Sequence, residues 1–396
     1  MHIAFFTNSY RPVISGVVRS ITLFRKALSD LGHNVFIFAQ KAEGYTDDEP
    51  FIFRYPRLPI PLPGDCPASL PISNFINQLL PCLKLDIIHT HHPIMIGEAG
   101  MVKARELNLP LVFTFHSQYD EYGQYYFPIQ QEKVQDFVRD LVVTWVDDYL
   151  RHCTHIIVPS YSMLELLTKT YKVRDCVTVI PTGIDLSSYQ LADGTAIRRQ
   201  LGWQNNRVMV TAGRLAPEKN LKTVLRAFSI ASQSVPELRL LIIGDGPERG
   251  ALEQMAQKMG LSALVHFTGL ISLENMPAYL KAGDFFCMAS TVETQGLVTM
   301  EAMAAGLPPV AVDAVGTRDI VDDNLNGFLT QNSSQSLAEA ILRICSETDI
   351  LSRMKAACIQ KAESFSIYRQ AEKLLEVYHQ AIVDKKAGKT VTVGDG

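Results

Sequence analysis

The chain has 396 residues, of which 47% are hydrophobic and 20% are charged. This length predicts two domains rather than one core, and the apolar content excludes disorder as the main character of the chain. With 37 Lys and Arg against 41 Asp and Glu, the chain lacks the basic excess of a duplex nucleic-acid binder, and it contains no apolar run of roughly 18 residues that would predict a membrane-spanning helix.

Short apolar runs bounded by turn signals predict the buried strands of a parallel sheet in the first half of the chain. These runs lie at 2–7, 34–39, 51–55, 86–89, 111–115 and 155–158. A helix between the loop 11–17 and Leu31 completes a βαβ unit. The helix 131–152 carries an apolar stripe, which predicts that it packs on the sheet. The proline-rich stretch 56–71 is expected to be a functional long loop.

The pattern restarts after the strand 177–180 and a polar segment, 187–206, which we interpret as the passage between domains. Further strands are predicted at 208–212, 238–243, 264–267, 285–288 and 309–312. The domains are expected at 1–185 and 186–367, with the amphipathic helix 368–385 packing back on the first domain and a disordered tail at 386–396. Two doubly wound α/β domains facing a central cleft would bind ligands at the carboxyl ends of their strands.

The segment Gly213-Arg-Leu-Ala-Pro-Glu-Lys-Asn220 lies where a strand ends and a helix begins. Arg214 and Lys219 would project beside the positive end of that helix, which is a natural diphosphate site. Taken alone, such a pair is more commonly two solvated basic residues on a loop.

A second motif places two carboxylates, Glu293 and Glu301, eight positions apart around the start of a helix. Backbone N–H groups near Gly296 and Leu297 would be free to hold phosphate, and the glutamates could hold sugar and ribose hydroxyls. In the alternative interpretation, Glu301 is an ordinary surface residue and Glu293 is a charge that complements the helix dipole. The basic loop upstream favours the functional interpretation.

Together with other landmarks, these motifs resemble the family 4 retaining glycosyltransferases, which have the GT-B fold. The resemblance covers nearly the whole chain, and the order and spacing of its landmarks carry it. The remaining landmarks are Ser15-Gly-Val17, Phe113-Thr-Phe-His-Ser117, Val158-Pro-Ser160, Ile180-Pro-Thr-Gly-Ile-Asp185 and Gly244-Asp-Gly-Pro247.

The resemblance implies a nucleotide-diphosphate-sugar donor, with UDP as the expected nucleotide. It implies that Gly16 lets the first loop approach the donor diphosphate, and that Arg214 and Lys219 neutralise the diphosphate as it leaves. It also implies that Glu301 binds the ribose. Backbone groups near Gly296, Leu297 and Ile271 are implied to contact phosphate and base.

For the reaction itself, the resemblance implies front-face transfer of a hexose, glucose by expectation, with retention of configuration. Glu293 is expected to bind hydroxyls of the transferred sugar, and His116 to hydrogen-bond that sugar or the acceptor. The departing diphosphate helps to deprotonate the incoming hydroxyl, so electrostatic stabilisation is the main contribution of the protein. No Asp-x-Asp motif is present, and two cations can replace Mg²⁺, so we expect neither a metal nor another cofactor.

Two departures from the family pattern are visible. The first loop has one glycine, Gly16, where many members have two, which puts the closeness of its phosphate contact in question. Thr294 and Gln295 replace a more usual glycine-aromatic pair after Glu293.

Two clusters near the expected acceptor side allow a plainer interpretation. The cluster of His89, His91 and His92 has no further metal-ligating residue at a recognisable spacing in the sequence. We therefore do not expect it to bind a metal, and we expect these side chains to line the cleft. The aromatic run 119–128 either lines an acceptor pocket or packs against the helix that follows.

The segments 89–97 and 114–119 are similar to branches of the family that glucosylate diacylglycerol. We therefore expect a lipid acceptor and peripheral membrane contact, for which the segments 58–71 and 75–84 are candidates. Transfer to a soluble sugar or metabolite is the alternative, followed by a nucleotide-sugar epimerase. A catalytically inactive binding protein is disfavoured because Arg214, Lys219, Glu293 and Glu301 are all present.

The compartment expected from the sequence is the cytoplasm, including the inner face of its membrane. The first twelve residues lack the basic segment of a signal peptide and are interrupted by Asn8, Arg11 and Pro12. Seven scattered cysteines without a Cys-x-x-Cys pair indicate reduced core thiols.

Overall fold

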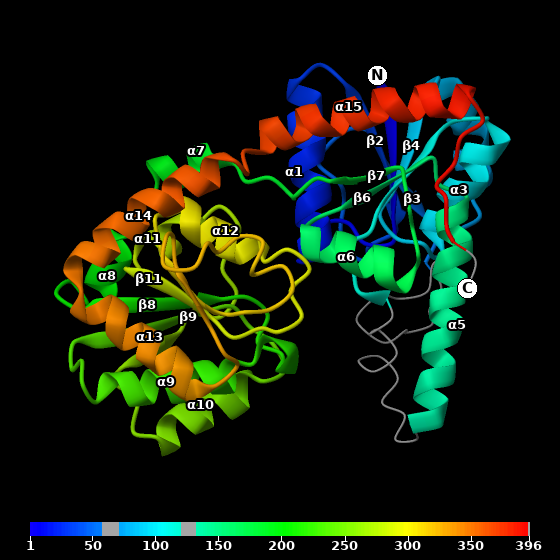
Figure 1. Ribbon diagram of the computed structural model, residues 1–396. Coiled ribbons are helices and arrows are strands. Elements are labelled where there is room, and N and C mark those ends of the chain that lie inside the picture. The colour runs from blue at the N-terminus through cyan, green and yellow to red at the C-terminus, as the bar shows by residue number, and fades with distance from the viewer. Residues whose placement is uncertain (58–70, 120–131, 395–396) are drawn as a thin grey trace. The chain divides into compact units, whose positions relative to one another are not determined.

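The computed structural model describes residues 1–57, 71–119 and 132–394, which form two compact units. The N-terminal unit comprises Met1–Gly183 together with the chain from Ile367 onward, and the C-terminal unit is Ile184–Ser366. Each unit is a parallel sheet with helices on both faces (Figure 1), which confirms the predicted α/β class. Within the described ranges, no helix has the length and apolar character needed to cross a bilayer.

The sheet of the N-terminal unit has seven parallel strands in the order β3-β2-β1-β4-β5-β6-β7. Its strands are β1 (His2–Thr7), β2 (Asn34–Gln40), β3 (Ile52–Tyr55), β4 (Ile87–Thr90), β5 (Leu111–Thr114), β6 (His155–Val158) and β7 (Val177–Val179). Its helices are α1 (Gly16–Asp30), α2 (Asn74–Leu79), α3 (Ile96–Glu106), α5 (Glu132–Arg151), α6 (Tyr161–Thr170) and α15 (Ile367–Lys386), with a 3-10 turn at Leu80–Leu83.

Alternating strand residues of this sheet are buried on opposite faces. Ile3 and Phe5 of β1 belong to a core cluster shared with α1 and α15, which lie side by side (Figure 1). Phe6 faces α3 on the other side, where a Cβ on Gly100 would come within 2.9 Å of its ring. Burial on both faces explains why the strands read as continuous apolar runs.

The C-terminal unit has six parallel strands in the order β10-β9-β8-β11-β12-β13. Its strands are β8 (Arg207–Ala212), β9 (Leu238–Ile243), β10 (Val265–Phe267), β11 (Phe285–Met288), β12 (Pro309–Val312) and β13 (Phe328–Thr330). Its helices are α7 (Leu186–Leu191), α8 (Thr195–Leu201), α9 (Leu221–Ser232), α10 (Arg249–Lys258), α11 (Met276–Lys281), α12 (Leu297–Ala304), α13 (Ser334–Ser346) and α14 (Thr348–Glu363), with a 3-10 turn, η3, at Pro217–Lys219.

Two expectations for this unit need correction. The strand β13 was not predicted, because three residues between polar turns carry too little pattern. The segment 187–206, interpreted as a passage between domains, instead forms α7 and α8 of the C-terminal unit. Tyr189 and Trp203 anchor it, with 2% and 8% of their surface exposed.

The apolar stripe of α5 packs only in part on the sheet, which corrects the expectation for the whole helix. Val146, Tyr149 and Leu150 are buried, whereas Phe137 and Leu141 are 67% and 61% exposed. A helix of 20 residues is about 30 Å long, and a four-residue strand such as β6 spans about 13 Å, so the strand cannot cover the whole stripe. The amino-terminal part of α5 extends away from the sheet (Figure 1).

The tail was expected to be disordered, and the structure contradicts this as far as residue 394. Val391 and Val393 are buried, and Val173 forms an antiparallel bridge with Val393. Thr392 donates to Asp175 through its backbone N–H and its hydroxyl, both at 2.8 Å. These alternating valines bury apolar area that offsets the entropy of ordering the chain end.

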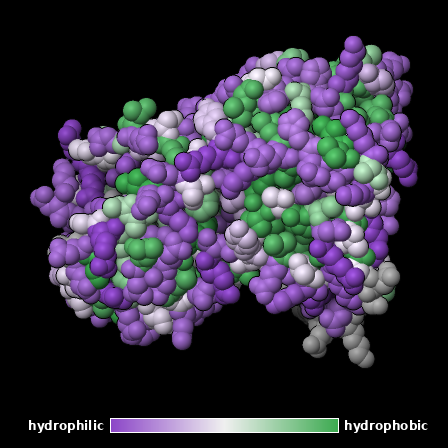
Figure 2. Space-filling model, turned by 45° about the horizontal axis from the view of Figure 1, so that its top comes forward, coloured by the Kyte–Doolittle hydropathy of each residue, from purple (hydrophilic) through white to green (hydrophobic). Residues whose placement is uncertain are grey.

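Hydrophilic residues dominate the face drawn in Figure 2, and hydrophobic residues reach this surface in separate patches. The six cysteines within the described ranges are free thiols. Cys82 is exposed, so the expectation of core thiols fails for that residue.

Candidate functional site

The predicted motifs of the C-terminal unit come together where its strand order reverses, between β8 and β11. In open α/β sheets, ligands bind beyond the carboxyl ends of the strands at this reversal. The loop that carries Arg214 and Lys219 follows β8, and the loop that carries Glu293 follows β11. Strand pairing therefore brings the two motifs to one edge of the sheet.

Two glycines allow the loop after β8 to lie tightly against the loop after β9. Gly213 and Gly244 have φ angles of 143° and 130°, and a Cβ on Gly244 would lie 2.0 Å from the carbonyl oxygen of Gly213. The N–H of Leu215 donates to the carbonyl of Asp245 at 2.9 Å. The backbone that carries Arg214 is thereby fixed before any ligand arrives.

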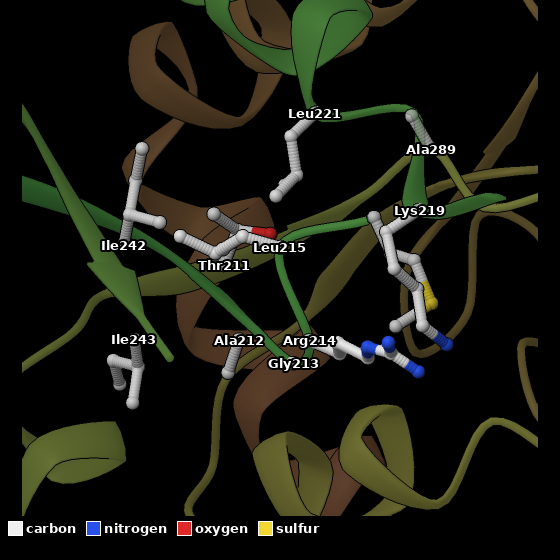
Figure 3. Close-up of a pocket in the computed structure, with 11 residues that line it drawn as sticks. Thr211, Ala212, Gly213, Arg214, Leu215, Lys219, Leu221, Ile242, Ile243 and Ala289 are labelled. Atoms are coloured by element: carbon white, nitrogen blue, oxygen red, sulfur yellow. The ribbon is translucent and has the colours of Figure 1, made fainter. Parts of the chain in front are cut away.

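Arg214 and Lys219 line one pocket at this edge of the sheet. In Figure 3 both side chains point to the same side, away from Ile242 and Ile243. Lys219 ends η3, and Asn220, with a φ of 52°, is the N-cap of α9. This tight turn sets the direction of the Lys219 side chain.

The loops after β8 and β11 are tied together by side chains. Lys219 Nζ forms an ion pair with Glu293 Oε1, and these side chains are 27% and 11% exposed. Ser290 Oγ donates to the carbonyl of Glu218 at 3.1 Å, and Asn220 Nδ2 donates to the carbonyl of Ala289 at 3.3 Å. The roles of Ser290 and Asn220 could not be predicted from the sequence, because loop spacing alone does not reveal partners across a sheet edge.

Glu293 is held in place by a close backbone approach from a later turn. Gly316 has a φ of 75°, and a Cβ on it would lie 2.5 Å from the carbonyl oxygen of Glu293. Val292 and Val315 form a bridge beside this contact. The rigid loop explains how Glu293 as a whole residue can be only 9% exposed beside the charged Lys219.

The start of α12 supplies backbone donors next to this loop. Gly296 has a φ of 73° and directly precedes Leu297, the first residue of α12. The first N–H groups of a helix have no acceptor within the helix, and they carry its positive dipole end. Leu297 and Ile271 pack against the same core cluster, while Glu301 is 3% exposed.

This arrangement can bind a doubly charged anion beside hydroxyl groups. Two cationic side chains and a helix start favour a diphosphate, since each supplies donors to phosphate oxygens. Carboxylates such as Glu293 accept hydrogen bonds from hydroxyls. The structure thus brings Arg214, Lys219, Glu293 and the start of α12 into one region.

In the N-terminal unit, Gly16 is the first residue of α1, and Ser15 caps that helix by accepting from the Val18 N–H at 3.2 Å. A Cβ on Gly16 would have nothing within 4 Å, and its φ is not in the left-handed region. The fold of this unit therefore does not require a glycine here. Its predicted role toward a donor diphosphate stays a prediction.

His116 lies just beyond β5 and is hydrogen-bonded to His91, which directly follows β4. His91 Nδ1 and His116 Nε2 are 3.0 Å apart, and the two rings stack with centroids 5.3 Å apart. His91 is 1% exposed, and His116 is half-buried. Both histidines were predicted to lie near the site but not to pair, although both follow neighbouring strands of the sheet.

Both imidazoles of this pair are neutral. Burial, with repulsion from neighbouring histidines, lowers the pKa of His91 and of His116 well below the usual value. Among the described residues, His91 Nε2 is buried without a hydrogen-bond partner. A buried N–H without an acceptor costs more free energy than a buried lone pair without a donor. The unpartnered Nε2 of His91 is therefore the unprotonated nitrogen, and its Nδ1–H donates to His116 Nε2. His116 then keeps its own proton on Nδ1, which makes it a hydrogen-bond donor.

His89 and His92 each have hydrogen-bond partners of their own. His89 Nδ1 lies 2.7 Å from the Tyr378 hydroxyl of α15, and its Nε2 lies 2.6 Å from Thr114 Oγ1. His92 Nδ1 accepts from the Asn8 N–H at 3.2 Å. These histidines hold the carboxyl end of the sheet together. Most of the aromatic run 119–128, from residue 120 on, and most of the segment 58–71 lie outside the described residues.

Comparisons with known proteins identify the family of this chain. The family model described as Glycosyltransferase Family 4 matches residues 14–188, and the one described as Glycosyl transferases group 1 matches residues 193–364. An alpha-monoglucosyldiacylglycerol synthase from Streptococcus pneumoniae is 31% identical, with 100% of this chain and 89% of that protein covered. The enzyme of the same name from Acholeplasma laidlawii is 28% identical, with 98% and 99% covered.

Solved structures extend the likeness to the fold. HepE from Anabaena, in complex with UDP and glucose, superposes with a TM-score of 0.77 at 21% identity, over 96% of this chain and 100% of that one. Sucrose-phosphate synthase from Thermosynechococcus elongatus superposes with a TM-score of 0.76 at 22% identity, over 96% and 99%.

Proposed function

Because this chain belongs to glycosyltransferase family 4, has the GT-B fold and so transfers a sugar from a nucleotide-sugar donor, we propose that it moves glucose from UDP-glucose to diacylglycerol with retention of configuration. The observation that carries the acceptor is the full-length similarity to two alpha-monoglucosyldiacylglycerol synthases. An α-linked product from an α-linked donor means retention at the anomeric carbon.

The donor part of the proposal is supported by the charges of the C-terminal unit. Arg214, Lys219 and the start of α12 stabilise the two phosphates as the bond from the sugar C1 to the diphosphate oxygen breaks. Glu293 accepts hydrogen bonds from the sugar, and Glu301 from the ribose. Since these fixed positive groups already supply the countercharge, we propose that the reaction needs no metal.

In the transfer step, a diphosphate oxygen takes the proton of the acceptor hydroxyl while the new bond to C1 forms on the face that the diphosphate leaves. His116 donates through its Nδ1–H to the sugar or to the acceptor, and His91 holds it in that tautomer.

Contact with a membrane surface is supported by the exposed part of α5. Phe137, Leu141 and Trp145 follow one another at intervals of four on one face of the helix, with 67%, 61% and 38% of their surface exposed. Such an apolar row can enter the interface of a bilayer that holds the acceptor. The double variant Phe137→Ser with Leu141→Ser should weaken vesicle binding, whereas Leu191→Ser, an exposed leucine of the other unit, should not.

The test measures UDP release from UDP-glucose and from UDP-galactose, with diacylglycerol vesicles, with soluble sugars or with no acceptor. Release only from UDP-glucose with the vesicles, unchanged by EDTA and giving an α-glucoside by NMR, supports the proposal. Release only with soluble sugars would refute the lipid acceptor, and release without any acceptor would favour an epimerase or a hydrolase. Loss of activity in EDTA that Mg²⁺ restores would refute metal independence.

A further inference from the structure

Three side chains of metal-ligating type meet in the N-terminal unit although they come from separate segments. They are His155, the first residue of β6, Cys176, which directly precedes β7, and Asp384 in the last turn of α15. One ligand atom of each lies within 4.8 Å of the others, and no other trio in the described ranges does so. The group lies at the amino ends of β6 and β7, at the edge of the sheet opposite to the one with His116.

His155 has a buried nitrogen available for a ligand. The residue is 7% exposed, and its Nε2 lies 2.9 Å from Thr178 Oγ1. Its Nδ1 is buried without a hydrogen-bond partner in the part of the chain that is described. An imidazole that donates its other N–H to a neighbouring oxygen is the usual arrangement of a metal-bound histidine.

Asp384 brings a negative charge that the surroundings only partly balance. Asp384 is 5% exposed and accepts from Gln380 Nε2 at 3.0 Å. Its nearest cation, Lys389 Nζ, is 3.8 Å away on a side chain that is 67% exposed. A bound divalent cation would favour the thiolate form of Cys176.

We propose that His155, Cys176 and Asp384 bind a divalent metal ion of the zinc class. One sulfur, one nitrogen and one oxygen ligand fit Zn²⁺ best, with water completing a tetrahedral set. The ion is structural, because it ties the end of α15 to the amino ends of β6 and β7. Next to it, the N–H of Arg174 donates to the carbonyl of Thr392 at 3.0 Å, so the ion also secures the chain end.

The experiment uses the full chain, stripped of metal by a chelator and then titrated with Co²⁺ and Zn²⁺. One equivalent of Co²⁺ should give a thiolate-to-cobalt charge-transfer band that Zn²⁺ abolishes. The band separates this site from adventitious binding by the other histidines, because those have no thiolate. Cys176→Ser should lose the band, and the matched control Cys345→Ser, a half-buried cysteine of α13, should keep it.

Two further variants keep the test decisive if Cys176→Ser folds poorly. Asp384→Asn should weaken Zn²⁺ binding, and Thr178→Val should weaken it by about 10–100-fold, the usual effect of removing a partner of a ligating histidine. Zn²⁺ should raise the Tm of the wild type and of Cys345→Ser but not of Cys176→Ser. Absence of the band in the wild type, or its persistence in Cys176→Ser, would overturn the proposal. Sugar transfer plays no part in these readouts.

Discussion

Lys219 and Glu293 form an ion pair between two loops whose partners lie 74 positions apart in the sequence. The pair links the expected partner of the diphosphate to the expected partner of the sugar. It holds both side chains in place before the donor binds, which reduces the reorganisation needed in the transition state.

Lys219→Met and Glu293→Gln should each lower kcat/KM by roughly 100-fold or more, because each removes a group that stabilises the transition state. The double variant should lose less than the product of the single losses, since the residues are in direct contact. Lys222→Met is the matched control, because it breaks a second Lys–Glu pair of the same unit, with Glu248. Near-normal rates for both single variants would refute the site assignment.

His116→Ala should reduce transfer strongly while leaving UDP affinity largely intact, because the nucleotide contacts are assigned to the C-terminal unit. His91→Gln should reduce kcat by about 10-fold through loss of the tautomer control, with a smaller change in the KM for the donor. His152→Ala is the control, since this histidine is exposed at the end of α5. A large loss of UDP affinity in His116→Ala would contradict the assignment.

Gly16→Ala separates ligand contact from folding. The added Cβ meets nothing within 4 Å, so the Tm should hold, while the KM for the donor should rise if the loop approaches the diphosphate. Gly250→Ala is the matched control, because Gly250 lies in the first turn of α10 and a Cβ on it also has no atom within 4 Å. An unchanged KM would remove Gly16 from the site.

By contrast, Gly244→Ala should destabilise the protein by about 2 kcal/mol or more, because it combines a strained φ with a backbone clash. Chemical denaturation followed by circular dichroism measures this. If this variant were as stable as the wild type, the loops after β8 and β9 could separate without a cost in free energy.

Stability should fall as the pH is lowered below about 6.5. Burial lowers the pKa of His89 from 6.5 to about 3 and that of His92 to about 4. Below pH 6.5 the unfolded chain binds protons that the folded chain does not, so each such histidine removes about 1.4 kcal/mol of unfolding free energy per pH unit. These histidines do not lower the unfolding free energy above about pH 7. The loss grows as the pH falls below about 6.5 and stops growing near the pKa of each histidine in the folded chain.

Urea unfolding between pH 7 and pH 4.5 tests this slope. His89→Gln should reduce the slope of unfolding free energy against pH by the amount that one proton contributes. The variant also loses the hydrogen bond to Tyr378, but that loss does not depend on pH in this range. The exposed His152→Gln is the control and should leave the slope as it is. An unchanged slope in His89→Gln would mean that His89 does not stay neutral in the folded chain.

The sequence by itself determined all the strands except β13, and the motif positions. Buried parallel strands such as 155–158, 238–243, 285–288 and 309–312 have the predicted bounds, because burial on both faces leaves a continuous apolar run between turn signals. Residues 213–220 and 293–301 could be recognised as parts of a site because glycine, charge and a helix start follow one another locally in each.

Only the tertiary structure decided which distant groups meet. Lys219 reaches Glu293 and His91 reaches His116 because neighbouring strands end together, and strand order is not written in local periodicity. The same holds for the exposed end of α5, whose stripe is as apolar as its buried part but extends beyond the strands. His155 and Asp384 lie 229 positions apart, and only the return of α15 to the first sheet places them beside Cys176.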